Sequence, residues 1–210
     1  MKINENISLE GHRVLLVPYN ENHVSRYHQW MKCPVLQQLT ASEPLTLEQE
    51  HAMQRSWRED GDKCTFIILD KELWTDPSVE EVQCMLGDVN IFLTDPTDPS
   101  LAELEVMIAE ASYRAKGLGK EVTRMMMSYG VTKLGVKKFQ VKIGLDNEIS
   151  VGMFKKLDFQ EVSVCKVFKE VTLEMTVDED VRTRLLNDTA FMKERDYTQA
   201  CRDRQELLSQ

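Results

Sequence analysis

Apolar runs alternate with helical stripes along the chain, and this alternation predicts a mixed α/β fold. Runs bounded by turn residues predict strands at residues 12–19, 64–70, 83–94, 102–108, 139–143, 161–167 and 169–177. Apolar positions three and four residues apart predict helices at 21–32, 46–58, 117–133 and 150–157. We therefore expect a twisted, mixed sheet of about seven strands with helices on both faces.

Local signals refine the limits of these elements. Thr46 and Gln49 have the spacing of a capping box, which opens the second helix. Gly87-Asp88 interrupts an apolar run and predicts a bulge, and Gly135 ends the third helix. Loops are expected at 34–45, 71–81 and 95–99. The first of them is expected to lie over one end of the functional site.

The composition changes near the C-terminus. The 210 residues are 42% hydrophobic and 29% charged, as in an ordinary globular domain with a full core. From residue 178 onward the chain is charged and poor in apolar side chains. We expect one folded domain over 1–177 and a charged tail over 178–210. The tail is predicted to be a frayed helix or disordered, and dispensable for chemistry.

A glycine turn follows the strand at 102–108 and leads into the long helix. It reads Arg114-Ala115-Lys116-Gly117-Leu118-Gly119. Its two glycines allow backbone N–H groups to converge on an anion, and the helix N-terminus adds unpaired donors and a positive dipole end. A Walker A loop would need glycine at position 114, and a Rossmann fingerprint would need a small residue at position 122. A phosphate-binding loop and a plain strand-to-helix turn both remain open.

Charge and cysteine content narrow the class of partner. The net charge of −9 argues against general binding of nucleic acid or of an anionic membrane. Residues 114–142 nevertheless hold eight Lys or Arg side chains and one acid, which suits either a polyanion or a solvated helix face. Five cysteines with no paired C-x-x-C predict neither a disulfide framework nor a zinc site, and no metal is expected. With no apolar run of membrane length, we expect a soluble cytoplasmic protein.

A second motif lies downstream, with one predicted strand between it and the glycine turn. It begins Asn147-Glu148-Ile149-Ser150 and ends Phe154-Lys155-Lys156-Leu157-Asp158-Phe159. The Arg-x-x-Gly-x-Gly turn and this Asn-x-x-Ser…aromatic-x-x-Leu-x-Phe pattern together resemble the two signatures of the GNAT acetyltransferases. The resemblance covers about residues 8–177 and implies the GNAT fold, with acetyl-CoA as co-substrate.

The resemblance also implies a set of residues that hold acetyl-CoA. In the family, the strand before the turn is splayed from its neighbour and pairs its backbone with the pantetheine arm. The turn amides hold the pyrophosphate with help from nearby basic side chains, and the Asn of the second motif reaches the pantetheine. That Asn is equally well explained as a helix N-cap. The residues at these positions here are Val106, Met107, Ile108, Arg114, Lys116, Gly117, Leu118, Gly119, Asn147 and Phe154.

Two acids on the strand before the turn are candidates for the general base. Glu103 and Glu105 lie two residues apart, so both face the same way. Glu103 matches the family's acid best and Glu105 is the reserve, while a solvated strand face explains both equally simply. Phe154 stands where many family members have a tyrosine general acid, so a leaving thiolate would depart without a donated proton. Asp158 replaces the usual glycine, at a position where Asp tolerates the left-handed conformation.

The form Tyr-Arg-x-Lys-Gly-x-Gly resembles the branch of the family that includes ribosomal-protein N-terminal acetyltransferases. Segments such as LVPYNENHVSRYHQWMK and GDVNIFLTD resemble a branch that acetylates tubulin. These likenesses imply acetyl transfer to a protein N-terminal α-amine, with tubulin or microtubules as partner and microtubule stability as the outcome. Two alternatives stay open: a small amine as acceptor, and a non-catalytic protein that binds CoA or microtubules.

Overall fold

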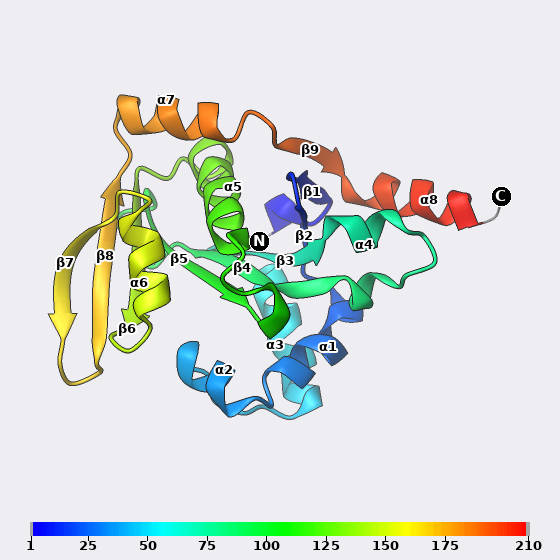
Figure 1. Ribbon diagram of the computed structural model, residues 1–210, viewed down its shortest axis with the longest axis horizontal. Helices are drawn as coiled ribbons and strands as arrows, with labels where there is room; N and C mark the ends of the chain where they lie inside the picture. The colour runs from blue at the N-terminus through cyan, green and yellow to red at the C-terminus, as the bar shows by residue number, and fades with distance from the viewer. Residues whose placement is uncertain (1, 209–210) are drawn as a thin grey trace.

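The strands form one mixed sheet in the order β7-β8-β6-β5-β4-β3-β2-β1-β9 (Figure 1). The computed structural model describes residues 2–208. Only the pair β5–β6 is parallel among the pairs of this sheet. The predicted fold class is confirmed, and β1 and β9 extend one edge beyond the seven predicted strands. The strands are β1 (Ile7–Glu10), β2 (Val14–Pro18), β3 (Lys63–Asp70), β4 (Met85–Phe92), β5 (Leu101–Ile108), β6 (Lys138–Gly144), β7 (Gln160–Cys165), β8 (Glu170–Thr176) and β9 (Lys193–Asp196).

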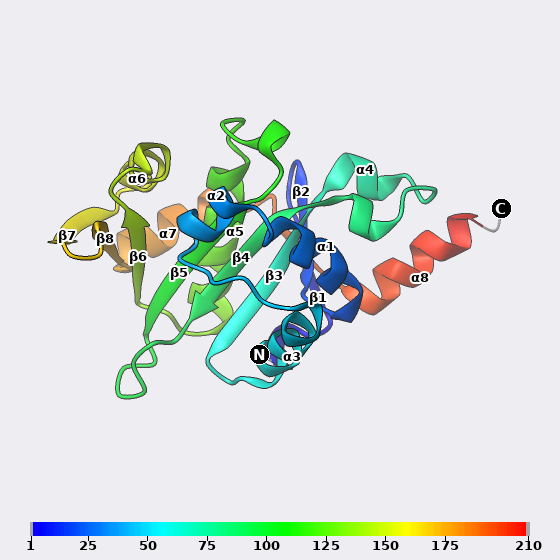
Figure 2. The same ribbon diagram turned by 90° about the horizontal axis from the view of Figure 1, so that it is seen from below.

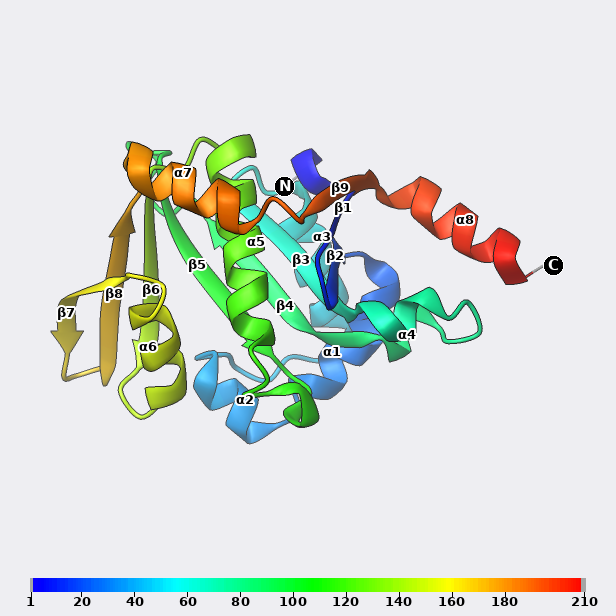
Figure 3. The same ribbon diagram turned by 45° about the horizontal axis from the view of Figure 1, so that its top comes forward.

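Helices cover both faces of the sheet, as the sequence predicts. The helices α1, α2 and α3 lie on one face (Figure 2), and α5 and α7 lie on the other (Figure 3). None of the helices within residues 2–208 combines the length and apolar character that a membrane span requires. The helices are α1 (Val24–Trp30), α2 (Pro34–Leu39), α3 (Leu47–Glu59), α4 (Lys71–Thr75), α5 (Leu118–Lys133), α6 (Glu148–Lys155), α7 (Glu179–Asp188) and α8 (Tyr197–Leu208), with short 3-10 turns η1 (Lys2–Asn4), η2 (Glu21–His23), η3 (Glu81–Gln83) and η4 (Ala111–Tyr113).

Each face of the sheet carries its own hydrophobic core. Under α5, the buried residues Met125 and Met126 pack with Phe66 and Phe139. On the opposite face, the aromatic side chains of α1 pack against β3 and the end of β5. The side chains of β5 alternate between the two cores, because successive residues of a strand point to opposite faces. Met107 therefore shares a face with Glu103 and Glu105, whereas Val106 and Ile108 face the core under α5.

Several of the local signals read from the sequence are confirmed. Thr46 and Gln49 form the capping box of α3. The register between β3 and β4 shifts beside Gly87, as expected of a bulge. Gly87 is required there, because a Cβ at this position would lie 1.8 Å from the carbonyl oxygen of Met107 on β5. Gly135 follows α5 with a φ of 71°, in the left-handed region.

Two segments expected to be loops contain short helices. Pro34 begins α2, where its fixed φ and its missing N–H are both tolerated. The side chain of Asp70 accepts hydrogen bonds from the backbone N–H groups of Glu72 and Leu73, which caps α4. Both helices are one or two turns long, so periodicity over their length was too weak to predict them.

The tail at 178–210 departs from the frayed or disordered segment that its composition predicted. Within residues 178–208 it folds as α7, β9 and α8, and β9 pairs antiparallel with β1. Its acids complement basic side chains of α5, since Arg124 pairs with Asp188 at 3.2 Å and Lys133 pairs with Glu194 at 2.9 Å. The charged composition therefore reflects docking onto the basic face of α5 rather than disorder.

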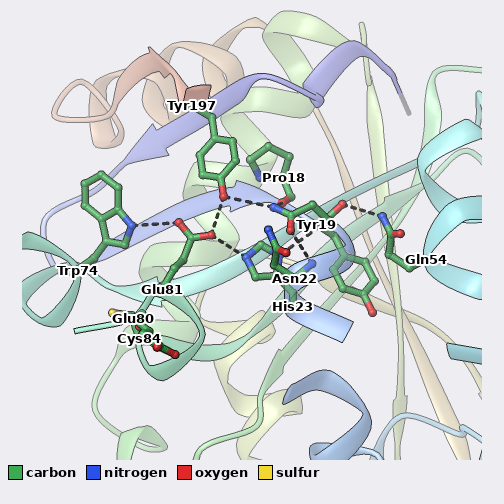
Figure 4. Close-up of polar contacts among 11 residues, drawn as sticks. Pro18, Tyr19, Asn22, His23, Gln54, Trp74, Glu80, Glu81, Cys84 and Tyr197 are labelled. Atoms are coloured by element: carbon green, nitrogen blue, oxygen red, sulfur yellow. Dashed lines mark hydrogen bonds and ion pairs between the residues drawn. The ribbon is translucent and has the colours of Figure 1, made fainter. Parts of the chain in front are cut away.

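A partly buried hydrogen-bond network joins the start of α8 to η2, η3 and α4 (Figure 4). Glu81 accepts hydrogen bonds from Nε2 of His23 at 2.9 Å, from the hydroxyl of Tyr197 at 2.6 Å and from the indole of Trp74 at 3.2 Å. The backbone N–H of Asn20 donates to Nδ1 of His23, which leaves the ring proton on Nε2. Burial opposes ionisation of Glu81, but the three donors lower its pKa below the ordinary value.

Tyr197→Phe is expected to reduce the free energy of unfolding by about 1.5–3 kcal/mol, because a hydrogen bond to a charged, buried carboxylate is lost. Urea titration followed by circular dichroism measures the change. Thr198→Ala is the matched control, since this neighbouring hydroxyl makes an exposed hydrogen bond to Asn6. A reduction no larger than that of the control would mean that the tail is not held at Tyr197.

Candidate active site

The strand β5 separates from β6 part-way along its length. The parallel pairing covers Leu101–Glu103 on β5 and Lys138–Gln140 on β6, while β4 stays paired with β5 as far as Ile108. The two strands then diverge toward the end of β5 (Figures 1 and 3). The backbone of residues 104–108 is therefore open on one side, and Val106, Met107 and Ile108 belong to this stretch. An open strand edge can accept an extended ligand that carries amide groups of its own.

The glycine turn meets the helix N-terminus with its donors uncapped. Ala115 and Gly117 both have positive φ, 57° and 80° respectively. Gly117 is the N-cap of α5 and carries no side chain that could accept a hydrogen bond from the first turn. The amides at 116–119 thus lie at the positive end of a helix of 16 residues. This arrangement fits an anion such as a pyrophosphate.

Two arginines stabilise the turn by donating hydrogen bonds to backbone carbonyl groups of the turn and of the end of β5. Arg114 donates from Nε to the carbonyl oxygen of Ile108 at 2.8 Å and from Nη2 to that of Ala109 at 2.7 Å. Arg13, which the sequence analysis did not single out, donates from Nη1 to the carbonyl of Lys116 at 2.8 Å. A trans peptide is planar, so this last bond points the N–H of Gly117 the opposite way, away from Arg13.

These contacts add a structural role for Arg114, because two of its donor nitrogens bind the chain itself. The guanidinium remains a cation beside the turn, and its action on the phosphate stays a prediction. Glu121 completes the arrangement by accepting from the backbone N–H groups of His12 and Arg13 and from Nε of Arg13. The turn is therefore positioned by β5 and by the β1–β2 connection. No periodic pattern relates residue 13 to residue 116, so the sequence offered no signal for Arg13.

Helix α6 forms the opposite wall of the opening. A Cβ placed on Gly119 would lie 3.2 Å from the sulfur of Met153, so the first turn of α5 and α6 approach closely here. Asn147 caps α6, with its side-chain oxygen accepting from the N–H of Ser150 at 3.2 Å. The N-cap interpretation of Asn147 is thus confirmed, and its contact with a cofactor stays a prediction. Asp158 adopts the left-handed conformation, with φ of 68°, as its position in the motif predicted.

Phe154 lies in the core at the base of α6. Its side chain is buried and packs edge-on against Phe159, with ring centroids 5.1 Å apart. Its contact with the cofactor stays a prediction. Packing alone accounts for a large aromatic residue here.

Phe154→Ala is expected to cost about 3–5 kcal/mol of stability, because it leaves a cavity beside Phe159. Phe154→Tyr is expected to keep turnover, since no general acid is needed for a thiolate leaving group. Thermal unfolding and acetyl transfer are measured together for both variants, with Ile149→Ala as the control from the exposed face of α6. Loss of turnover in a stable Phe154→Tyr variant would contradict the assignment of this helix.

The two acids of β5 share one face, as predicted, but differ in environment. Both line an open cleft of about 390 Å³ together with Asp62, Lys63 and Phe92. The carboxylate of Glu103 is bound to Lys142 on β6 at 2.6 Å. Glu105 is exposed toward the cleft, yet partial desolvation of its carboxyl group, with Asp88 and Glu103 nearby, raises its pKa to about 7. Of the two, Glu105 has the electrostatic properties of a base that works near neutral pH.

A buried acid on β4 was not identified from the sequence as a site residue. Asp88 is 2% exposed and stands opposite Met107 in the antiparallel pair with β5. Burial raises its pKa to about 7, against the lowering effect of a hydrogen bond from Asn90. The signal was present, since an aspartate inside the apolar run of 85–92 is unusual, but we interpreted Gly87-Asp88 only as a bulge.

Half of the cations in the basic segment at 114–142 are neutralised within the chain. Four of its eight cations form ion pairs, with partners on β5, β8, α7 and β9: Arg124, Lys133, Lys138 and Lys142. The ammonium of Lys116 lies over the ring of Tyr113, 5.6 Å from its centroid. The positive charge that remains close to the turn comes from Arg114, Lys116 and Lys120, since Arg13 pairs with Glu121 at 3.2 Å.

Comparison with protein families and with curated relatives agrees with this geometry. The model of the acetyltransferase (GNAT) domain matches residues 13–160. The chain belongs to the GNAT acetyltransferase family. It is 57% identical over 199 residues to the human alpha/beta-tubulin-N-acetyltransferase 9, covering 94% of this chain and 96% of that protein. The mouse protein of the same name is 57% identical over 94% of this chain and 82% of its own length. This GNAT chain is an acyltransferase.

Solved structures of the family share the fold. A spermidine N-acetyltransferase from Vibrio cholerae, in complex with CoA and spermine, matches with a TM-score of 0.68 at 13% identity, over 81% of this chain and 98% of that one. A ribosomal L7/L12 alpha-N-protein acetyltransferase, in complex with coenzyme A, matches with a TM-score of 0.65 at 16% identity, over 79% and 95%. At such identities these GNAT structures bear on the fold alone.

Proposed function

We propose that this GNAT enzyme transfers the acetyl group of acetyl-CoA to the α-amine of a protein N-terminus, with alpha- and beta-tubulin as acceptors. The observation that carries the proposal is the 57% identity, over nearly the whole chain, to proteins named for tubulin N-acetylation. On this proposal the enzyme acts in the cytoplasm, and its products favour stable microtubules. Residues 1–177 carry the chemistry, while the docked tail contributes stability.

Acetyl-CoA is the co-substrate that the site fits. The uncapped amides at 116–119 would bind the pyrophosphate, and the open backbone of Val106, Met107 and Ile108 would bind the pantetheine arm. Lys116 would add charge beside the phosphates. Acetyl-CoA supplies an acetyl group activated as a thioester. The protein itself binds and orients the two substrates, and its side chains exchange protons with them.

Glu105 is proposed as the base. An α-ammonium has a pKa of about 7.7–8.0, so a carboxylate whose pKa lies near 7 can take its proton with little energetic cost. Glu103 is bound to Lys142 and serves mainly as the second negative charge of the cleft. The neutral amine then attacks the thioester carbonyl, the new N–C bond replaces the C–S bond, and the second proton of the nitrogen passes to water. Phe154 offers no proton to the departing thiolate, which needs none because its pKa is about 8.5.

A small polyamine is the second candidate acceptor. The cleft beside Glu105 also contains Glu103 and Asp62, and three acids in one cleft suit a polycation. A related fold binds spermine in the Vibrio cholerae enzyme. A third possibility, binding of CoA or microtubules without catalysis, predicts no acetylated product of either kind.

Acetyl transfer to synthetic peptides tests the proposal. The enzyme is incubated with acetyl-CoA and peptides that begin as alpha- and beta-tubulin do, and the peptide mass is measured. The matched controls are the same peptides with a blocked N-terminus and spermidine. An increase of one acetyl group on the free peptides alone supports the proposal. Transfer to spermidine alone supports the polyamine alternative, and cofactor binding with no product supports the non-catalytic alternative.

A further inference from the structure

Asp88 is a buried acid on the face of the sheet that also carries Glu103 and Glu105. Its Oδ2 atom accepts a hydrogen bond from the amide of Asn90 at 2.6 Å, and the side-chain oxygen of Asn90 accepts from the hydroxyl of Thr65 at 2.6 Å. Its Oδ1 atom is buried and has no hydrogen-bond partner within residues 2–208. The carboxyl group is therefore held in one orientation from one side and left unsatisfied on the other.

Such a group opposes stability. A buried polar atom without a partner costs about 1–3 kcal/mol, and a buried carboxylate costs more when ionised. Gly87 and Val89 flank Asp88 along β4, and Asn90 follows on the same face, so a valine or isoleucine at position 88 would remove the unsatisfied oxygen at the cost of one hydrogen bond from Asn90. A destabilising acid at a well-packed position indicates a role outside folding.

The register of the sheet brings Asp88 close to Glu105. In the β4–β5 pair, Asn90 lies directly opposite Glu105 and Asp88 lies opposite Met107, the next residue of β5 on the same face. Diagonal neighbours on one face of an antiparallel pair are within about 7–8 Å. Asp88 and Glu105 therefore share one side of the sheet, and the amide of Asn90 lies next to both.

The other titratable groups around this pair do not cancel its negative charge. Burial raises the pKa of Tyr19 and of Tyr27, so both stay neutral. The carboxyl group of Glu50 on α3 lies 3.7 Å from the ring of His28. Lys142 on β6 is bound to Glu103 on β5 at 2.6 Å. The groups that face Asp88 or Glu105 are Glu103 from β5, Lys142 from β6, Tyr27 from α1, Glu50 from α3 and Tyr19 from the turn after β2. Asp62 and Lys63 also line the cleft beside Glu105, and the ammonium of Lys63 pairs with Asp60 at 3.2 Å.

We propose that Asp88 is a positioning residue for acetyl transfer, whose buried negative charge makes Glu105 a stronger proton acceptor. This inference rests on the proposed function, since it concerns the same reaction. Asp88 itself touches neither amine nor thioester. A like charge nearby makes the loss of a proton from Glu105 less favourable, so the carboxylate takes a proton from the acceptor ammonium more readily.

The test compares Asp88→Asn with the wild-type enzyme. The side-chain carboxyl carbon of Glu105 is titrated by NMR, and the pH dependence of kcat/KM is measured with a tubulin-like peptide. Without the charge of Asp88, the midpoint of Glu105 is expected to fall by about 0.5–1 pH unit, and the acidic limb of kcat/KM to move with it. The wild-type curve should also be broader than that of the variant, because two interacting carboxyl groups titrate as a pair.

Glu206→Gln is the control, since Glu206 is an exposed acid on α8 that does not line the cleft. It should leave both midpoints unchanged. An unmoved Glu105 midpoint in folded Asp88→Asn, with activity reduced equally at every pH, would overturn the inference and leave Asp88 a packing residue. If Asp88→Asn does not fold, Glu105→Gln provides the reciprocal measurement, because loss of the interaction must lower the midpoint of Asp88 as well. Absence of turnover in the wild type would overturn the proposed function, whereas the NMR midpoints would still decide the coupling of the two acids.

Discussion

Gly119→Val is expected to abolish acetyl-CoA binding in a protein that remains folded. Gly119 lies in the first turn of α5, where backbone donors must approach the pyrophosphate closely. A Cβ here points at the sulfur of Met153, 3.2 Å away across the opening, and a flexible thioether can move aside. The branched side chain then fills the space that the phosphates need. A loss of at least about 100-fold in affinity is expected, equal to about 2.7 kcal/mol.

Isothermal titration calorimetry with acetyl-CoA measures the affinity, and thermal unfolding reports whether the variant is folded. Gly61→Val is the matched control, because a Cβ at Gly61 meets no atom within 4 Å. Gly117→Val is a poorer test, since its φ of 80° would strain any other side chain and lower stability as well as binding. Wild-type affinity in folded Gly119→Val would remove the turn from the cofactor site.

The parts of the fold set by local pattern were predictable. The stripe of α5, the capping box at Thr46 and the alternation along β5 each depend on residues a few positions apart. The two motifs resembling the GNAT signatures located the turn and α6 for the same reason. The placement of Glu103 and Glu105 on one face followed from the period of a strand alone.

The remaining features depend on contacts between distant positions. The strand β9 forms only because β1 is available to pair with it, nearly 190 residues earlier in the chain. Arg13 reaches Lys116 across 103 residues, and Lys142 meets Glu103 only because β5 and β6 are neighbours. Periodicity carries no information on such pairs, so the ion pair that distinguishes Glu103 from Glu105 became visible only in the structure.

Glu105→Gln is expected to lower kcat/KM by about 100-fold near pH 7 and by tenfold or less near pH 9. The pKa of Glu105 is raised to about 7 by desolvation and by the nearby acids, so its carboxylate is available above that pH. Below pH 7 the wild-type rate falls as Glu105 becomes protonated. The variant has no base and must wait for the amine to lose its proton to water, which occurs near pH 8. The difference between the two enzymes therefore narrows as the pH rises.

The measurement is a pH–rate profile from pH 6 to 9.5 with a tubulin-like peptide at concentrations below KM. Glu103→Gln is the matched comparison, because it removes the same charge from the same strand and face. Since Glu103 is bound to Lys142, its loss is expected to change kcat/KM by about threefold or less and to leave the shape of the profile similar. The opposite ranking, with Glu103→Gln the slower enzyme at neutral pH, would transfer the role of base to Glu103. If both variants keep the wild-type profile, the proton of the ammonium leaves through water, and the acids of β5 serve only to attract the amine to the cleft.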